Sequence, residues 1–253
     1  MLKLENVSFT YKDGTHALRR MSFEAQAGEF LLILGHNGAG KSTFLRLLNG
    51  ILKPTDGRLT VGGLDTMAHS PARLAKEVAV TFQNPRDQIF ASTVEREIAF
   101  GPTILQRLHA TELTIAALQQ FGFTAERASH PYDLPPSRQK LLSIASAVAM
   151  DSAVLAFDEP SAGLSVPERQ MLTKTFSDLR RNRLLLVVSH DLDLFLPLAT
   201  RVFIFQNGTL TADVAPTMML HNEKMLRKAT LKLPLSLRLR KAFDLPSFRT
   251  PLI

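Results

Sequence analysis

The chain has 253 residues, of which 45% are hydrophobic, so it can bury the core of one large domain, with or without an appendage, and global disorder is excluded. It contains no cysteine, which excludes disulfides, thiolate zinc sites and cysteine nucleophiles and fits a reducing compartment. The formal net charge of +7 either keeps the surface soluble or attracts an anionic partner, and charge alone does not choose between the two.

The first third of the chain predicts strands, a loop and a helix. Leu2–Tyr11 alternates in part between apolar and polar residues, and Phe30–Leu34 is a continuous apolar run with the length of a buried strand. A glycine-rich loop over Gly35–Gly40 follows. Apolar residues at spacings of three and four then predict a helix over Ser42–Leu52, which Pro54 ends.

The rest of the chain alternates between strands and helices. Val78–Phe82 predicts a strand, and residues 92–149 have helical character. The elements predicted after it are the strand Val154–Phe157, the helix Pro167–Arg181 and the strands Leu184–Ser189 and Arg201–Gln206. This alternation predicts an α/β fold with a mostly parallel sheet covered on both faces and a helical insert at about 90–150.

No segment predicts a membrane span or a secretion signal. The apolar runs are far shorter than the roughly 20 residues that cross a bilayer. Residues 1–6 lack the apolar centre of a signal peptide. We therefore expect a cytoplasmic protein, whose role at a membrane would need other subunits.

The segment from Gly35 to Thr43 fits the pattern G-x-x-x-x-G-K-[ST], in which backbone N–H groups of a glycine-rich loop surround phosphate groups. It lies between a strand and a helix, so the positive end of the helix dipole also faces the phosphates. We predict that Lys41 neutralises the β- and γ-phosphates and that the Ser42 hydroxyl binds Mg²⁺. The predicted nucleotide-binding residues of this loop are Gly35, His36, Asn37, Gly38, Ala39, Gly40, Lys41, Ser42 and Thr43.

Two acidic residues, Asp158 and Glu159, follow the apolar strand Val154–Phe157. An aspartate at such a strand end holds Mg²⁺ in phosphate-loop proteins. A glutamate next to it is well placed to orient or deprotonate the attacking water. Acids at strand ends are also common on solvated edges, and it is the phosphate loop that favours the metal site.

Three further residues have a functional and an ordinary interpretation each. His190 follows a predicted strand at the sheet edge where ligands bind, and is either a γ-phosphate contact or a surface or helix-capping histidine. Gln83 follows Val78–Phe82, and either reaches Mg²⁺ and the attacking water or is a plain loop residue. Tyr11 either stacks on adenine or packs against the core.

In this order, these residues resemble the motifs of the nucleotide-binding subunits of ATP-binding-cassette (ABC) transporters, over roughly residues 2–214. The resemblance implies ATP and Mg²⁺ as ligands, and an ABC ATPase fold of the P-loop NTPase class with an N-terminal antiparallel β subdomain, a mostly parallel core sheet and a helical subdomain. It implies a nucleotide-binding domain over residues 1–214 and a basic helical extension over residues 215–253. The roles it implies are adenine stacking by Tyr11, a Walker A loop at Gly35–Thr43, Mg²⁺ ligation by Ser42, Gln83 and Asp158, and catalysis by Glu159, His190 and Gln83.

A narrower resemblance is to the ATPases of energy-coupling factor (ECF) transporters, importers of vitamins and of transition-metal ions such as cobalt or nickel. It rests on Phe82–Phe90, Thr93–Glu95, Ala99–Pro102 and the tail segment Met225–Pro234. It implies a coupling subunit and a substrate-binding subunit in the membrane, and a place for this chain at the cytoplasmic face. Residues Asn84–Phe90 would then lie in or beside the surface that receives the coupling helix; the alternative is an exposed loop without a partner.

The sequence departs from the family pattern at two motifs. The signature Leu-Ser-Gly-Gly-Gln is replaced by residues 134–138, Leu-Pro-Pro-Ser-Arg, in which Pro135 and Pro136 supply no N–H group and no close approach to phosphate. In the second motif, Ser165 stands where the family usually has aspartate. Because each ATP of such a dimer lies between the Walker motifs of one chain and the signature of the other, we expect a heterodimer with a related subunit whose signature is intact.

The expected function is therefore that of an ATP-hydrolysing subunit that powers an importer. An ATPase of another ABC transporter class and a non-hydrolysing regulatory subunit are the alternatives. A soluble ABC protein acting on ribosomes or DNA is a further class, but it usually needs two fused cassettes or long inserts, for which 253 residues leave no room.

Overall fold

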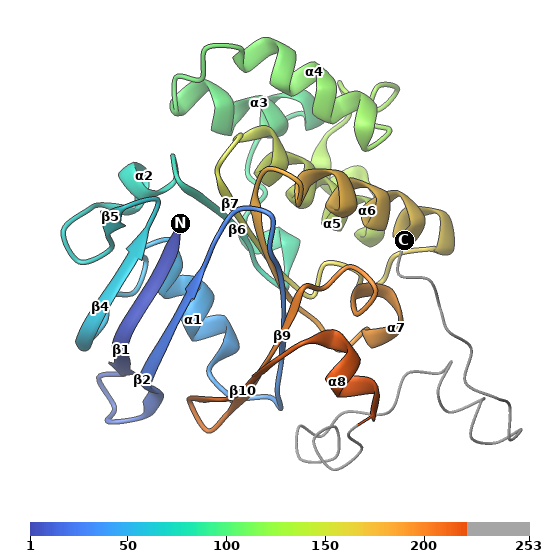
Figure 1. Cartoon of the computed structure of the whole chain (residues 1–253). Helices are drawn as coiled ribbons and strands as arrows, with labels where there is room; N and C mark the ends of the chain where they lie inside the picture. The colour runs from blue at the N-terminus through green and yellow to red at the C-terminus, as the bar shows by residue number, and fades with distance from the viewer. Residues whose placement is uncertain (222–253) are drawn as a thin grey trace, which may run out of the picture.

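The structure, a computed structural model, describes residues 1–221 (Figure 1). Its N-terminal part is a four-stranded antiparallel sheet in the order β2-β1-β4-β5. The strands are β1 (Leu2–Thr10), β2 (His16–Ala25), β4 (Asp56–Val61) and β5 (Leu64–Asp65). In β1 the buried Leu2, Leu4, Val7 and Phe9 are separated by polar residues, as in a sheet with one covered face.

The second sheet has six strands in the order β10-β9-β3-β8-β7-β6. They are β3 (Phe30–Leu34), β6 (Val78–Thr81), β7 (Val154–Asp158), β8 (Leu184–Val188), β9 (Arg201–Gln206) and β10 (Thr209–Val214). All pairings are parallel except that of β9 with β10, a hairpin closed by Asn207 and Gly208. The mostly parallel core sheet predicted from the sequence is confirmed.

Helices and the antiparallel sheet cover the core sheet on both faces. The longer helices are α1 (Lys41–Leu48), α3 (Val94–Ile104), α4 (Ala110–Gln120), α5 (Pro136–Ala149) and α6 (Val166–Leu179). The shorter ones are α2 (Pro71–Leu74), α7 (Leu192–Phe195), α8 (Pro216–His221) and the 3₁₀ turns Pro85–Asp87 and Pro131–Asp133. Figure 1 shows α3 and α4 together at one end of the molecule, beyond α5.

The two covered faces contain separate hydrophobic cores. In β3, Leu31 and Ile33 pack with α1 and the antiparallel sheet, whereas Phe30, Leu32 and Leu34 pack with residues of α3 to α6. Both faces of a parallel strand must therefore be apolar, which explains why β3, β7 and β8 are continuous buried runs.

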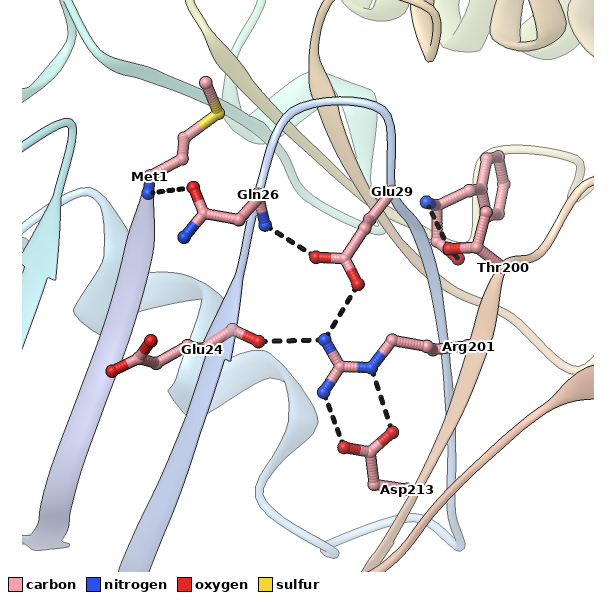
Figure 2. A network of polar contacts seen from close by, with 8 residues as sticks. Met1, Glu24, Gln26, Glu29, Thr200, Arg201 and Asp213 are labelled. Carbon is pink, nitrogen blue, oxygen red and sulfur yellow. Dashed lines mark hydrogen bonds and ion pairs between the residues drawn. The ribbon is translucent and has the colours of Figure 1, made fainter.

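Arg201 joins the two sheets through a network of polar contacts (Figure 2). From β9 its Nη1 donates to the Glu24 carbonyl on β2 at 2.8 Å and to the Glu29 carboxylate at 2.9 Å. Its Nε and Nη2 donate to the two oxygens of Asp213 on β10 at 3.0 and 2.5 Å. The other oxygen of Glu29 accepts from the Gln26 N–H at 2.6 Å.

Two predicted helix boundaries were wrong. The first helix begins at Lys41 and ends at Leu48 instead of running from Ser42 to Leu52. Gly50 adopts a left-handed backbone at φ 74°, which stops the helix before Pro54 is reached. The helix predicted over Pro167–Arg181 begins at Val166 and ends at Leu179.

The C-terminal part is only partly described. Of the extension predicted over residues 215–253, residues 216–221 form α8, in which Met219 is buried. The tail segment Met225–Pro234 lies outside the described residues. None of the helices within residues 1–221 has both the length and the apolar character that crossing a bilayer requires.

Candidate active site

The glycine-rich loop between β3 and α1 has a backbone that only glycine allows at two points. Gly40, directly before α1, has φ 99°, and a Cβ there would lie 2.5 Å from the Ala17 carbonyl oxygen. At Gly35 a Cβ would lie 2.4 Å from the Phe205 carbonyl oxygen. These close approaches fix the loop against β2 and β9 and bring its N–H groups to the start of α1, where an anion is favoured.

Lys41 lies inside the curve of this loop. Its side chain is buried, and Nζ donates to the carbonyl oxygens of Gly35 at 2.6 Å and of His36 at 3.0 Å. Burial lowers the pKa of Lys41, and the charges of Asp158 and Glu159 act in the opposite direction. The ammonium group is thus held at the loop by neutral acceptors, which a phosphate can replace.

Ser42 and Asp158 meet at the end of the core sheet. The Ser42 hydroxyl donates to Oδ2 of Asp158 at 2.9 Å, joining the first turn of α1 to the last residue of β7. Asp158 is 5% exposed, and this burial raises its pKa, against the opposing effects of Ser42 and Lys41. A hydroxyl and a carboxylate held together in this way are hard oxygen ligands of the kind that Mg²⁺ prefers.

Glu159 follows β7 with an unusual backbone and an unpaired carboxylate oxygen. Its φ is 47°, and its N–H donates to the Val188 carbonyl at 2.8 Å. The Ser189 hydroxyl donates to Oε2 at 3.0 Å, whereas Oε1 is buried without a hydrogen-bond partner and lies 3.6 Å from Nε2 of His190. Burial raises the pKa of Glu159, and the positive charge of His190 acts against it. A strained residue with an unsatisfied acceptor and a raised pKa is suited to accept a proton from bound water.

A cavity of about 700 Å³ contains most of the residues that the sequence predicted for the site. Of these it is lined by Tyr11, Asn37, Gly38, Gly40, Lys41, Ser42, Thr43, Gln83, Asp158, Glu159 and His190. Tyr11 is attached to the loop by a hydrogen bond between its hydroxyl and that of Thr43, at 2.9 Å. Gly35, His36 and Ala39 do not line the cavity; the first two hold Lys41 through their carbonyl groups.

Sequence reasoning missed five residues of the cavity wall: Thr15, His16, Ala17, Arg46 and Ala162. Arg46 is the one with a usable signal, because it lies four residues after Ser42 in the predicted helix and therefore on the same face. Its guanidinium carbon lies 5.9 Å from the centre of the Phe82 ring. His16 was missed because it comes from the β1–β2 hairpin, and no local sequence pattern specifies the register of that hairpin. Its Nδ1 forms a hydrogen bond with the Thr10 hydroxyl at 2.8 Å.

The side chains of the altered signature segment are turned toward other parts of this chain. Pro135 precedes α5 and provides no side-chain cap. The Ser137 hydroxyl donates to Oε1 of Glu168 at 3.2 Å. The Arg138 guanidinium lies 4.0 Å from the Phe123 ring centre and donates to Glu126 at 3.1 Å. Both side chains are therefore engaged within this chain.

Ser165, at the second altered motif, caps α6 instead of presenting a charge. Oε2 of Glu168 accepts from the Ser165 N–H at 2.7 Å and from its hydroxyl at 2.8 Å. Burial acts to raise the pKa of Glu168, but the hydrogen bonds from Ser165 and Ser137 outweigh it and lower the pKa. Both departures from the family pattern thus meet at one carboxylate.

The donor set fits a Mg²⁺ ion bound with few protein ligands. In the part of the chain that the structure describes, no group of three or more histidine, aspartate or glutamate side chains is arranged to hold a metal ion. Mg²⁺ usually keeps several waters and binds one or two carboxylates together with substrate phosphates. Asp158 and Ser42, joined by a hydrogen bond, and Gln83 on the wall of the same cavity agree with that pattern.

Comparisons with known proteins identify relatives over almost the whole chain. A family model described as ABC transporter matches residues 18–162. The energy-coupling factor transporter ATP-binding protein EcfA of Methanothermobacter thermautotrophicus is 33% identical over 239 residues, which are 92% of this chain and 77% of the relative. A putative ABC transporter ATP-binding protein of Gloeobacter violaceus is 38% identical over 93% of this chain and 98% of its own length.

Solved structures agree with the fold. A structure of cbiO1 from Clostridium perfringens, part of the ABC transporter complex cbiONQ, has a TM-score of 0.76 and 28% identity and covers 95% of this chain and 98% of its own. A dimeric ATP-binding cassette in a post-hydrolysis state with ADP and phosphate has a TM-score of 0.78, with 85% of this chain and 99% of its own covered. Its identity of 22% supports the fold alone. The predicted ABC ATPase fold is confirmed.

Proposed function

This chain belongs to the ABC transporter family of ATP-binding proteins, and from that premise we propose that it hydrolyses ATP to power an ECF-type importer. The cargo would be a vitamin or a transition-metal ion that passes through separate membrane subunits. The subunit would be peripheral, at the cytoplasmic face. Similarity to relatives named as ECF transporter ATP-binding proteins and to cbiO1 supports the ECF type.

In this proposal the domain that binds the nucleotide covers residues 1–214, with the helical subdomain at about 90–150 inserted, and residues 215–253 form an extension. Gly35–Thr43 holds the phosphates, and Tyr11 stacks on adenine. Ser42, Gln83 and Asp158 hold Mg²⁺, which when bound neutralises phosphate charge. Glu159 accepts a proton from the attacking water, and His190 and Gln83 contact the γ-phosphate region.

One observation supports this assignment above the others. Lys41 and Ser42 at the start of α1, and Asp158 and Glu159 where β7 ends, come from two distant parts of the chain and meet in one cavity. Oε1 of Glu159 is buried there without a hydrogen bond, which costs on the order of 1–3 kcal/mol. Such a cost is typical of a site whose remaining partner is a ligand.

We further propose that the working unit is a heterodimer. Pro135 and Pro136 provide no N–H group, and Ser137 is engaged with Glu168, so the signature of this chain is a poor partner for ATP held by a second subunit. Its own Walker side retains Lys41 and Glu159. A related subunit with an intact signature would complete that side and leave the opposite site weakened.

ATPase rates test both proposals. The chain alone should turn over slowly. Co-expression with a related ATPase subunit whose signature is intact should make turnover at least tenfold faster, because the complete site regains the hydrogen bonds to phosphate that Pro135 and Pro136 cannot make. Co-purification with a membrane subunit should accompany the faster rate. High turnover by the lone chain would rule out the heterodimer, and no turnover in any assembly would rule out the ATPase.

A non-hydrolysing regulatory subunit is the second candidate, and the prolines at 135 and 136 favour it. An ATPase of another ABC transporter class is the third and shares all the site residues. The presence of Glu159 and His190, 3.6 Å apart, favours hydrolysis over regulation. A Glu159→Gln variant separates hydrolysis from regulation. Transport that is unchanged in this variant would mean that the chain only binds nucleotide.

A further inference from the structure

Lys140 is a buried cation beside the active site that none of the assigned roles uses. It lies in α5, five residues after Pro135, and only 4% of it is exposed. A buried ammonium group is costly unless hydrogen-bond acceptors surround it. An apolar side chain of the same length would therefore be cheaper at this position if packing were its only task.

The acceptors of Lys140 belong to the segment that leaves β6. Its Nζ donates to the main-chain oxygen of Gln83 and, at 3.4 Å, to that of Phe82. The neighbouring Gln139 contacts the same segment, because its Oε1 accepts from Nε of Arg86 at 3.2 Å. The start of α5 is thus fastened to the chain on both sides of Asn84.

The charges around Lys140 agree with its place at the site. Burial lowers its pKa, and the charges of Asp158 and Glu159 act in the opposite direction. The same two carboxylates also act on Lys41. The carboxylates of the cavity therefore act on Lys140, although Lys140 does not line the cavity.

We propose that Lys140 is a positioning residue that holds the main chain of Gln83 and so fixes where the Gln83 side chain meets MgATP. The inference rests on the proposed role of Gln83. Lys140 would act through Gln83 and not on the nucleotide itself, because it does not line the cavity. It couples the position of α5, which carries the altered signature, to Gln83 through two carbonyl groups.

Substitutions at Lys140 separate positioning from packing. Methionine matches the length of the lysine stem without donors, whereas arginine keeps the charge and the donors but is larger. If Lys140 positions Gln83, Lys140→Met raises the Kd for Mg²⁺–AMP-PNP about tenfold and Lys140→Arg raises it less than about threefold. If Lys140 only packs, Lys140→Met should raise this Kd less than Lys140→Arg does. Lys174→Met, at an exposed lysine of α6, is the matched control and leaves the Kd unchanged.

A double-mutant cycle gives the decisive readout, measured by calorimetry on the full chain with circular dichroism to verify folding. Once Gln83 is replaced by alanine, Lys140→Met should change the Kd less than about twofold, because there is no side chain left to position. A full tenfold effect in the Gln83→Ala background, or no effect in the wild type, would overturn the inference while the proposed function stands. A wild-type chain that does not bind Mg²⁺–AMP-PNP would instead overturn the proposed function and this inference with it.

Discussion

At the scale of single residues, Glu159 has the features on which its proposed role as general base depends. Its backbone is left-handed, one carboxylate oxygen is buried without a hydrogen bond, and its pKa is raised by burial. Each of these features has a stability cost. Their coincidence at a residue next to Asp158 and 3.6 Å from His190 is what a general base requires.

Replacing Glu159 by glutamine should remove hydrolysis and leave binding. The amide cannot accept a proton from water, so we expect kcat to fall about 10²- to 10⁴-fold. The Kd for MgATP should change less than about threefold, because Lys41, Ser42 and the loop are untouched. Phosphate release by the co-expressed assembly and calorimetry on the single chain measure the two quantities. Unchanged phosphate release would show that Glu159 is not the base.

The raised pKa of Glu159 also predicts how stability depends on pH without nucleotide. The folded state binds this proton more tightly than the unfolded state, so the contribution to stability is present below the ordinary pKa and is lost as the pH rises through the raised value. At pH 7.5 Glu159→Gln should therefore be more stable than wild type by about 1 kcal/mol, or about 2–4 °C in Tm. The difference should shrink as the pH is lowered toward 4.5, the ordinary value. Thermal scans between pH 4.5 and 8 measure it, and a difference that grows on acidification would contradict the assignment.

Residues that belong to a local motif could be predicted from the sequence, and residues defined by distant contacts could not. The loop Gly35–Thr43 is specified by spacing between a strand and a helix, and the structure brings most of it to the cavity wall. The contact of Lys140 with Gln83 could not be predicted from a local pattern, because the two residues are 57 positions apart in the chain. The hydrogen bond between Ser137 and Glu168 could not be predicted for the same reason.

At the scale of elements, the apolar strands were predictable because a parallel strand must be apolar on both faces. Phe30–Leu34 has the same bounds in the structure as in the sequence pattern, and the strand predicted over Leu184–Ser189 ends one residue earlier, at Val188. The end of α1 was not predictable from periodicity, since Leu52 continues the apolar spacing and only the conformation of Gly50 ends the helix.

The connection between the two sheets predicts a stability effect that is independent of function. Arg201→Met would leave the Asp213 and Glu29 carboxylates without their shared cation (Figure 2). We expect a loss of about 2 kcal/mol, or about 4–8 °C in Tm. Arg58→Met is the matched control, because its ion pair with Asp65 is more exposed, and it should cost at most about 0.5 kcal/mol. Equal losses in the two variants would mean that the Arg201 network adds nothing beyond a surface pair.

At the scale of the whole molecule, the residues proposed for catalysis and those of the altered signature lie in different parts of the chain. One edge combines Lys41, Asp158 and Glu159 in a cavity, whereas the start of α5 has prolines and a serine that is engaged with Glu168. In the proposed heterodimer, a related subunit with an intact signature would complete the site formed by Lys41 and Glu159. The asymmetry expected from the sequence stays a prediction, and the contacts of Ser137 and Arg138 within this chain support it.

Restoring the signature should make the lone chain active. Replacing Pro135, Pro136, Ser137 and Arg138 by Ser, Gly, Gly and Gln returns the donors that face ATP of a second copy. We expect the ATPase rate of the lone chain to rise at least tenfold, as one or two charge-assisted hydrogen bonds of about 1.5–3 kcal/mol are regained per site. Adding Glu159→Gln to this variant should abolish the gain, and a gain that survives would show that Glu159 is not the base.

If the ammonium group of Lys41 and the amides of its loop bind the phosphates of MgATP, calorimetric titration of the nucleotide into wild type and Lys41→Ala will show it. We expect the variant to stay folded and to lose at least about 100-fold in affinity, because a charge-assisted contact to phosphate is removed at the centre of the site. An unchanged Kd in a folded Lys41→Ala protein would contradict it.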